Sequence, residues 1–158
     1  LNTWRRPESD NDLNDAERSG FERYVANGGA LLSVHISAGS CPEWAPMKKI
    51  TGGGWITGES FHPPFGWFQV HIDQPDHPIA AGVSDFWTYD ECYCGLDIQP
   101  GIDVFMHGIV DGEDRPLGWS HQFSEGKVAN IALGHAGSSQ QHPEFQKLIL
   151  NALDYLSK

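Results

Sequence analysis

The stretch from Gly28 to Gly39 constrains the fold of this chain more than any other feature. Gly28 and Gly29 stop a helix, and the apolar segment Ala30–Ile36 follows directly and ends at a turn of small residues. A nearly continuous apolar run is typical of a strand that is covered on both faces, as in parallel α/β sheets. His35 lies at the end of this strand, where open α/β sheets bind their ligands. A hydrogen-bonded structural histidine is the competing interpretation.

Length and charge limit the partners that this chain can have. At 158 residues it is long enough to bury a core without disulfides, and we expect residues 1–158 to form one domain. Acidic residues outnumber basic residues by 21 to 10, which gives a formal net charge of −11. Such a surface repels phosphate backbones and anionic membranes. Apolar runs also stay well below the roughly 18 residues of a membrane span, so we expect neither nucleic acid nor a membrane as a partner.

The cysteines point to a reducing environment. Cys41, Cys92 and Cys94 are odd in number and too few for a disulfide scaffold, which favours free thiols and a cytoplasmic location. Cys92-x-Cys94 lacks the C-x-x-C spacing and the second pair of a zinc motif. Cys41 is a candidate nucleophile only by residue type, because no neighbouring residue marks it as a thiolate.

Periodicity and end signals predict two main helices and a set of strands. Asn14 and Glu17 form a capping box for a helix that stops at Gly28. Pro143 opens the last helix, along which apolar residues recur at helical spacing. We also predict a short helix over Cys41–Ile50, strands at 65–73, 102–110, 116–123 and 127–133, and a short strand-like piece at 87–93.

A long irregular loop, Thr51–Pro64, contains several glycines and prolines together with Trp55 and His62. Long ordered loops in compact domains are usually functional, and the aromatic content argues against disorder. Tryptophans such as Trp55 are either stacking faces for a ligand or core residues, and the sequence leaves both interpretations open.

His135 repeats the pattern of His35, because it follows the predicted strand 127–133 through Gly134. If the two strands are parallel neighbours, both imidazoles project over one edge of the sheet. Two such histidines can bind a transition metal, act as an acid–base pair, or serve structure and substrate binding.

A metal is one of these alternatives. Two imidazoles and a carboxylate can hold Zn²⁺ with one position open for water or substrate, and we name His35, His62 and His135 as ligands. The sequence contains no compact metal motif such as H-E-x-x-H, so this hypothesis depends on the predicted fold.

Several segments together resemble one known family. They are Phe21–His35, His77-Pro78-Ile79-Ala80-Ala81-Gly82-Val83, Asp90-Glu91-Cys92-Tyr93, Ala132–His135 and His142-Pro143-Glu144-Phe145. In combination they are similar to the ThuA-like (trehalose utilisation) family, with the fold of class I glutamine amidotransferases. The resemblance implies a flavodoxin-like, mainly parallel sheet flanked by helices.

The resemblance also carries expectations about chemistry. In the amidotransferases, the strand that corresponds to Leu31–Ile36 ends in a nucleophilic cysteine, whereas this chain has His35 there. Glutaminase activity is therefore not expected, because it needs a thiolate. His135 falls where the amidotransferases have their catalytic histidine. The family's association with sugar metabolism, of oxidised disaccharides, implies a sugar as the small-molecule partner.

Two functions remain open at this point. The first is an isomerase, lyase or hydrolase that acts on a sugar or keto-sugar at the strand-end histidines. The second is a noncatalytic sugar-binding or regulatory module. For the enzyme, we assign catalytic roles to His35, His135 and Glu91, and substrate contacts to Trp55, His62, Asp90 and Tyr93.

The beginning of the chain looks like the exit of a strand, Leu1-Asn2-Thr3-Trp4. Compared with the family fold, the chain lacks the first strands and helices, so we expect an N-terminally incomplete domain. An apolar strand with an unpaired edge readily finds partners. We therefore expect the chain to form a homo-oligomer or to associate with the missing segment.

Overall fold

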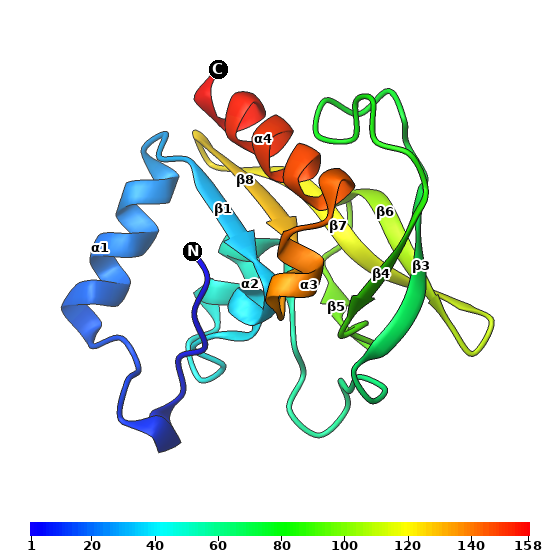
Figure 1. Ribbon diagram of the computed structural model, residues 1–158. Coiled ribbons are helices and arrows are strands. Elements are labelled where there is room, and N and C mark those ends of the chain that lie inside the picture. Colours follow the sequence, from blue (N-terminus) through cyan, green and yellow to red (C-terminus); the bar gives the residue numbers. More distant parts are fainter.

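The chain folds into an α/β structure in which helices cover a curled mixed sheet (Figure 1). The computed structural model describes residues Leu1–Lys158, apart from the side chain of Pro7. The main sheet has six strands in the order β1-β8-β7-β6-β3-β4, and β2 and β5 form a small second sheet. The strands are β1 (Leu31–Val34), β2 (Gly53–Gly54), β3 (Gly66–Ile72), β4 (Phe86–Asp90), β5 (Asp97–Ile98), β6 (Asp103–Val110), β7 (Glu113–Phe123) and β8 (Gly126–Ile131).

The helices begin and end where local signals place them. They are η1 (Pro7–Ser9), α1 (Asp15–Ala26), η2 (His35–Gly39), α2 (Pro46–Thr51), α3 (Gly137–Gln140) and α4 (Pro143–Ser157). The predicted capping box is present: the Asn14 side chain accepts from the backbone N–H of Glu17, and the Glu17 carboxylate accepts from the N–H of Asn14. The helix predicted over Cys41–Ile50 starts later, at Pro46.

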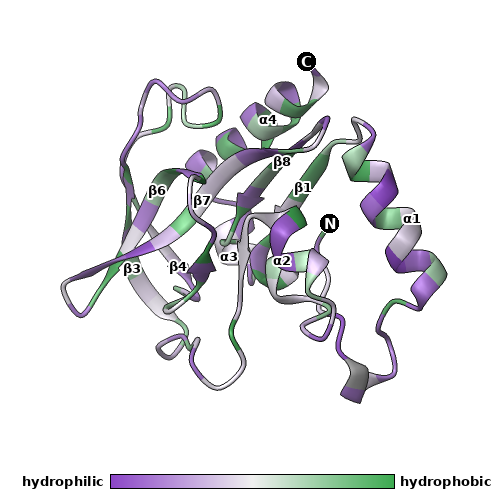
Figure 2. Ribbon diagram, turned by 180° about the vertical axis from the view of Figure 1, so that it is seen from behind, coloured by the Kyte–Doolittle hydropathy of each residue, from purple (hydrophilic) through white to green (hydrophobic). Residues whose placement is uncertain are grey.

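Helices pack on both faces of the strand pair β1–β8. Helix α4 contacts both strands on one face, and Leu148 and Ala152 are fully buried there. On the other face, Val25 of α1 and Ile50 of α2 pack against Leu31 and Val128. From that side, α1 shows mostly hydrophilic residues, while β1 is hydrophobic along its length (Figure 2). The near-continuous apolar pattern of β1 follows from this double cover.

The mainly parallel, flavodoxin-like sheet is not confirmed, because the main sheet is mostly antiparallel. Strands β1 and β8 are parallel, but β8-β7, β7-β6, β6-β3 and β3-β4 are antiparallel pairs. Parallel neighbours need a crossover of a dozen or more residues. Only Asp111 and Gly112 join β6 to β7, and both have positive φ, as a tight hairpin turn requires. The predicted turn at Asp111-Gly112 is therefore present, and a turn this short joins antiparallel strands.

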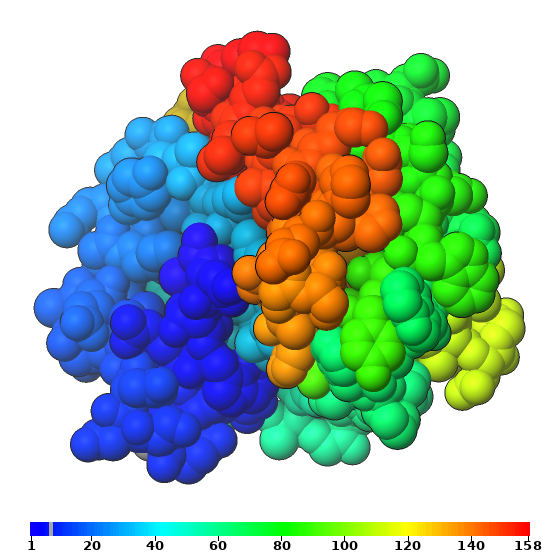
Figure 3. Space-filling model, in the orientation of Figure 1, coloured from blue at the N-terminus to red at the C-terminus, as the bar shows by residue number. Residues whose placement is uncertain are grey.

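The first residues of the chain run beside the free edge of β1. The carbonyl of Leu1 accepts from the backbone N–H of Val34, and the N–H of Thr3 donates to Ser37 Oγ. In Figure 3 this segment (dark blue) meets the segment around α3 (orange) on the front of the molecule. These contacts brace the turn that carries His35. None of the helices in the described part of the chain combines the length and the apolarity needed to cross a membrane.

Candidate metal centre and active site

His35 occupies a strained position at the end of β1. Val34 is the last extended residue, and His35 has a φ of 58°, in the left-handed region that residues other than glycine rarely adopt. Such strain persists only where the surroundings hold it, and it is concentrated at functional sites. Here the hydrogen bonds of Leu1 and Thr3 around the turn hold it.

His135 reaches the same edge of the sheet. Strands β1 and β8 pair in parallel, with Val34 opposite Ile131, so the condition under which both imidazoles share one edge of the sheet is met. Gly134 turns the chain with a φ of 106°. The rings of His35 and His135 then meet edge to face, with centroids 5.1 Å apart.

Asp90 fixes the loops that carry Glu91 and His135. Its carboxylate accepts the backbone N–H groups of Glu91 at 2.9 Å, Gly134 at 2.7 Å and His135 at 3.0 Å. Asp90 is only 1% exposed. The sequence predicts that Asp90 contacts a sugar, but in the structure both of its carboxylate oxygens accept hydrogen bonds from backbone N–H groups.

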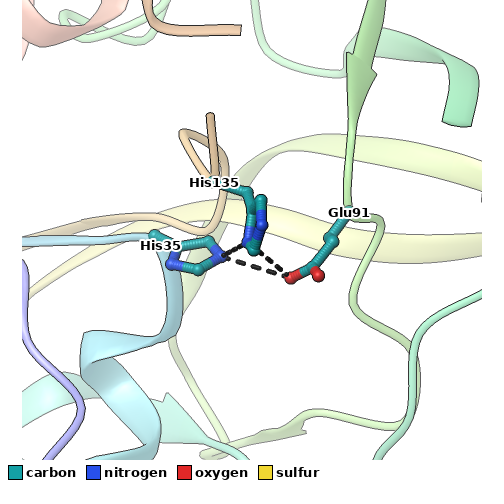
Figure 4. A group of neighbouring side chains, drawn as sticks. All are labelled: His35, Glu91 and His135. Atoms are coloured by element: carbon teal, nitrogen blue, oxygen red, sulfur yellow. Dashed lines mark hydrogen bonds and ion pairs between the residues drawn. The ribbon is translucent and has the colours of Figure 1, made fainter. Parts of the chain in front are cut away.

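Glu91, the residue directly after β4, lies close to both histidines. Glu91 Oε2 lies 3.4 Å from His35 Nε2 and 3.1 Å from His135 Nδ1, and these two nitrogens are 3.3 Å apart (Figure 4). Four ligands at the usual zinc bond lengths of about 2.0–2.1 Å have neighbours about 3.3 Å apart in a tetrahedron. Three potential ligand atoms therefore already have the mutual spacing of a zinc site. We call His35, Glu91 and His135 the HEH centre.

Burial favours the neutral form of His35 in the centre and of the neighbouring Tyr93 hydroxyl. Burial lowers the pKa of His35, against the opposing effect of the hydrogen bond to Glu91. A neutral imidazole is the form that binds a metal. Burial, followed by the nearby Glu91 charge, raises the pKa of the Tyr93 hydroxyl. That hydroxyl therefore stays protonated at neutral pH, and it donates to Glu91 Oε2 at 3.1 Å and also contacts His35 Nε2.

His62 lies beside the centre and outside its three ligand atoms. Its Nδ1–H donates to the Pro63 carbonyl at 2.8 Å, and its Nε2 lies 3.7 Å from the second oxygen of Glu91. The sequence predicts His62 as the third member of the metal site, but in the structure Glu91 is the third member. His62 keeps a free ring nitrogen next to the cavity.

A cavity of about 250 Å³ opens over the HEH centre. Its lining contains the predicted residues Trp55, His62 and Tyr93, and also Trp4, whose ring meets that of Trp55 edge to face. Sequence reasoning did not identify Trp4 as a site residue. The signal that could have found it is the strand-exit pattern of Leu1-Asn2-Thr3-Trp4, since an extended segment beside β1 ends at the same edge of the sheet.

The three cysteines belong neither to the HEH centre nor to the lining of its cavity. Burial raises the pKa of Cys41 to about 11 and that of Cys92 to about 12, and it also raises that of Cys94. All three thiols are buried and protonated at neutral pH. This gives no support to Cys41 as a nucleophile.

The pKa shifts predict that acid weakens the fold. Burial lowers the pKa of His35, His77 and His121, so the folded chain leaves these rings neutral in weak acid. In the unfolded chain they take up protons as pH falls through about 6.5. The unfolded state then binds more protons, and the free energy of unfolding should decrease from pH 7.5 to pH 5.5.

Urea unfolding at both pH values measures this change, and His77→Gln, which removes one of the three imidazoles, should show a smaller decrease. A free energy of unfolding that stays constant or rises toward pH 5.5 would contradict the assignment.

One family model matches this chain, and solved structures share its fold. The family model described as trehalose utilisation (ThuA) matches residues 2–156. A ThuA-like protein from Parabacteroides merdae is 19% identical, with a TM-score of 0.83 over 93% of this chain and 67% of that chain. A second one, from Bacteroides uniformis, is 21% identical, with a TM-score of 0.73 over 90% of this chain and 64% of that chain.

More distant structures share only part of their length with this chain. A β-galactosidase from Bacillus circulans is 16% identical, with a TM-score of 0.65 over 92% of this chain but 21% of the enzyme. The chain thus spans about two thirds of the ThuA-like structures and about a fifth of this β-galactosidase. At these identities the structures show the fold alone. No curated protein matches the chain.

Proposed function

Because this chain belongs to the trehalose utilisation (ThuA) family, we propose that it acts in carbohydrate metabolism as a metal-dependent enzyme with Zn²⁺ at the HEH centre. The observation that carries the proposal is the spacing of the three ligand atoms, 3.1–3.4 Å, at the floor of a cavity. Two imidazoles with a carboxylate suit zinc, which takes nitrogen and oxygen ligands in four-coordinate sites.

The substrate that fits this cavity is a sugar that carries a carbonyl group. A metal with three protein ligands has an open position, where it polarises a carbonyl oxygen or activates a water molecule. The rings of Trp4 and Trp55 provide apolar faces for the C–H side of a sugar ring. We therefore propose a keto-sugar or an aldose–ketose pair as the substrate.

The residues around the metal site have separate roles in this proposal. Tyr93 stays protonated and donates a hydrogen bond to Glu91, and the same hydroxyl can donate a hydrogen bond to a substrate oxygen in the cavity. His62, with its free Nε2 at the wall of the cavity, is the candidate base for a proton next to the polarised carbonyl. This set of groups suits isomerisation or elimination beside a carbonyl.

Buried cysteines and a Salmonella typhimurium neighbour described as a cytoplasmic protein support a cytoplasmic location. That neighbour is 19% identical, with a TM-score of 0.66 over 92% of this chain and 62% of its own.

The test compares metal content and turnover in the same preparation. We expect about one equivalent of zinc per chain, and turnover of at least one member of a panel of keto-sugars and aldose–ketose pairs. Chelation should abolish that turnover, and added Zn²⁺ should restore it. His35→Ala should abolish both metal binding and turnover.

His142→Asn is the matched control, because it removes an imidazole elsewhere while asparagine still caps α4. Turnover that survives both chelation and His35→Ala would show that the centre is not catalytic. Sugar binding without turnover of any panel member would favour the noncatalytic sugar-binding module.

A further inference from the structure

The side chain of Asn130, near the end of β8, is fully buried, and neither Nδ2 nor Oδ1 has a hydrogen-bond partner among the residues that the structure describes. This amide can donate two hydrogen bonds and accept two more, and burying such groups unpaired costs free energy. Nearly all buried polar groups in folded proteins are hydrogen-bonded to protein or to ordered water. The amide of Asn130 therefore indicates a bound water molecule or another small polar ligand beside it.

A small cavity of about 10 Å³ is lined by Asn130, and we call it the inner cavity. Asn130 shares this lining with Trp119 and Ala132, which are also almost completely buried. Four residues line both the inner cavity and the larger cavity over the HEH centre, namely His35, Ile36, Trp55 and Tyr93. These four residues form a wall between the two cavities, so His35 borders both.

The inner cavity has the size and the polar groups for one water molecule. A cavity needs about 10–15 Å³ to hold a water molecule, which then makes about three hydrogen bonds. The N–H of Trp119 is already used, because it donates to the Thr51 carbonyl at 2.8 Å. The hydroxyl of Tyr93 is used within the HEH centre. Among the side chains of the lining, this leaves the amide of Asn130 and the ring of His35.

The ring of His35 needs an acceptor on the side that faces away from the HEH centre. Every hydrogen bond of this ring in the described chain involves Nε2, which contacts Glu91, Tyr93 and His135. A neutral imidazole with a free lone pair on Nε2 carries its proton on Nδ1. In Figure 4 this second nitrogen lies on the side of the ring away from Glu91. A histidine that binds a metal almost always donates its other N–H to a carboxylate, a carbonyl or a water molecule.

We propose that Asn130 is a positioning residue for His35 and acts through one water molecule in the inner cavity. The Nδ1–H of His35 donates to the water oxygen, and the water donates to Oδ1 of Asn130. These two hydrogen bonds fix the tautomer of His35 and hold its Nε2 toward Glu91. The effect on zinc binding rests on the proposed function, whereas the tautomer of His35 does not depend on it.

Ser33 provides the matched control for this proposal. It lies directly opposite Asn130 in the pairing of β1 with β8. It is fully buried, and its Oγ also lacks a partner in the described chain. Ser33 does not line the inner cavity, although it precedes His35 by only two residues. Ser33→Ala therefore changes a buried polar side chain next to Asn130 without changing the proposed water site.

The first experiment is NMR of the metal-free full chain at pH 8, where long-range ¹H–¹⁵N correlations show which ring nitrogen of each histidine carries the proton. His35→Ala assigns the signals of His35. We expect the proton of His35 on Nδ1, and cross-peaks between the side-chain amide protons of Asn130 and a long-lived water molecule. Asn130→Leu, which has a similar size and no polar atom, should give a mixture of both tautomers. Asn130→Asp keeps an acceptor oxygen at the same place and should keep the proton on Nδ1.

The second experiment measures zinc affinity by competition with a chelator. Asn130→Leu should bind Zn²⁺ about 10–100-fold more weakly than the wild type, as is typical when a group that supports a metal ligand is lost. Ser33→Ala should keep both the wild-type affinity and the wild-type tautomer. If Asn130→Leu does not fold, the water cross-peaks and Asn130→Asp still test the proposal.

The outcomes separate this proposal from the metal centre. A wild-type His35 protonated on Nε2, an Asn130 amide without a water cross-peak, or an unchanged tautomer in Asn130→Leu would each overturn the role of Asn130, even if zinc binds tightly. Equal effects of Asn130→Leu and Ser33→Ala would overturn it too, because they would reflect packing alone. A changed tautomer in Asn130→Leu, with no zinc bound by the wild type, would support the role of Asn130 and contradict the metal centre.

Discussion

Replacement of Glu91 by glutamine is expected to lower the affinity of the chain for Zn²⁺ by more than about 100-fold, beyond the 10–100-fold typical of losing a group that only supports a ligand. Glu91 Oε2 is the atom shared by both imidazoles, at 3.1 and 3.4 Å. The amide has the same shape but no charge, and an uncharged oxygen is a poorer ligand for a divalent cation. The loss therefore reports coordination rather than packing.

Competition with a chromophoric chelator measures this affinity. Glu59→Gln is the matched control, because Glu59 is an exposed carboxylate on the neighbouring loop. We expect the wild-type affinity for Glu59→Gln and a similar free energy of unfolding for the metal-free forms of all three proteins. If Glu91→Gln binds Zn²⁺ as tightly as the wild type does, Glu91 is not a ligand and the metal centre is wrong.

Replacement of Asp90 by alanine is expected to lower the free energy of unfolding by about 3–5 kcal/mol. The carboxylate is 1% exposed and accepts three backbone N–H groups, those of Glu91, Gly134 and His135. Alanine would leave these donors without their acceptor in a buried environment. Because two of the three donors belong to residues of the HEH centre, zinc affinity should fall as well.

Urea unfolding of the metal-free proteins measures the stability change without any contribution from zinc binding. Asp85→Ala is the matched control. Asp85 also accepts a backbone N–H, that of Ile72, but its side chain is 47% exposed, so water replaces the lost bond and the cost should stay near 1 kcal/mol. Equal losses in the two variants would show that Asp90 does not hold the loops together. Asp90→Asn, which keeps one acceptor oxygen, should fall between the wild type and Asp90→Ala.

The sequence by itself determined the features of this protein that depend on neighbouring residues. The capping box of Asn14 and Glu17, the opening of α4 at Pro143 and the hairpin turn at Asp111-Gly112 are all present. They are predictable because each depends on hydrogen bonds or backbone angles within about four residues. The continuous apolar pattern of β1 likewise indicated a strand covered on both faces.

Only the tertiary structure decided which distant side chains meet. Periodicity shows which face of a strand is buried, but not which strand lies beside it or in which direction, so the mostly antiparallel sheet differs from the expected parallel one. The third member of the HEH centre, Glu91, lies 56 residues from His35 in the chain, and its position depends on β4 and on the buried Asp90. The position of Asn130 near His35 also arises from a pairing across strands, that of Ser33 with Asn130. Such contacts are set by the packing of the whole sheet, because local propensities contribute too little energy to choose among alternative strand neighbours.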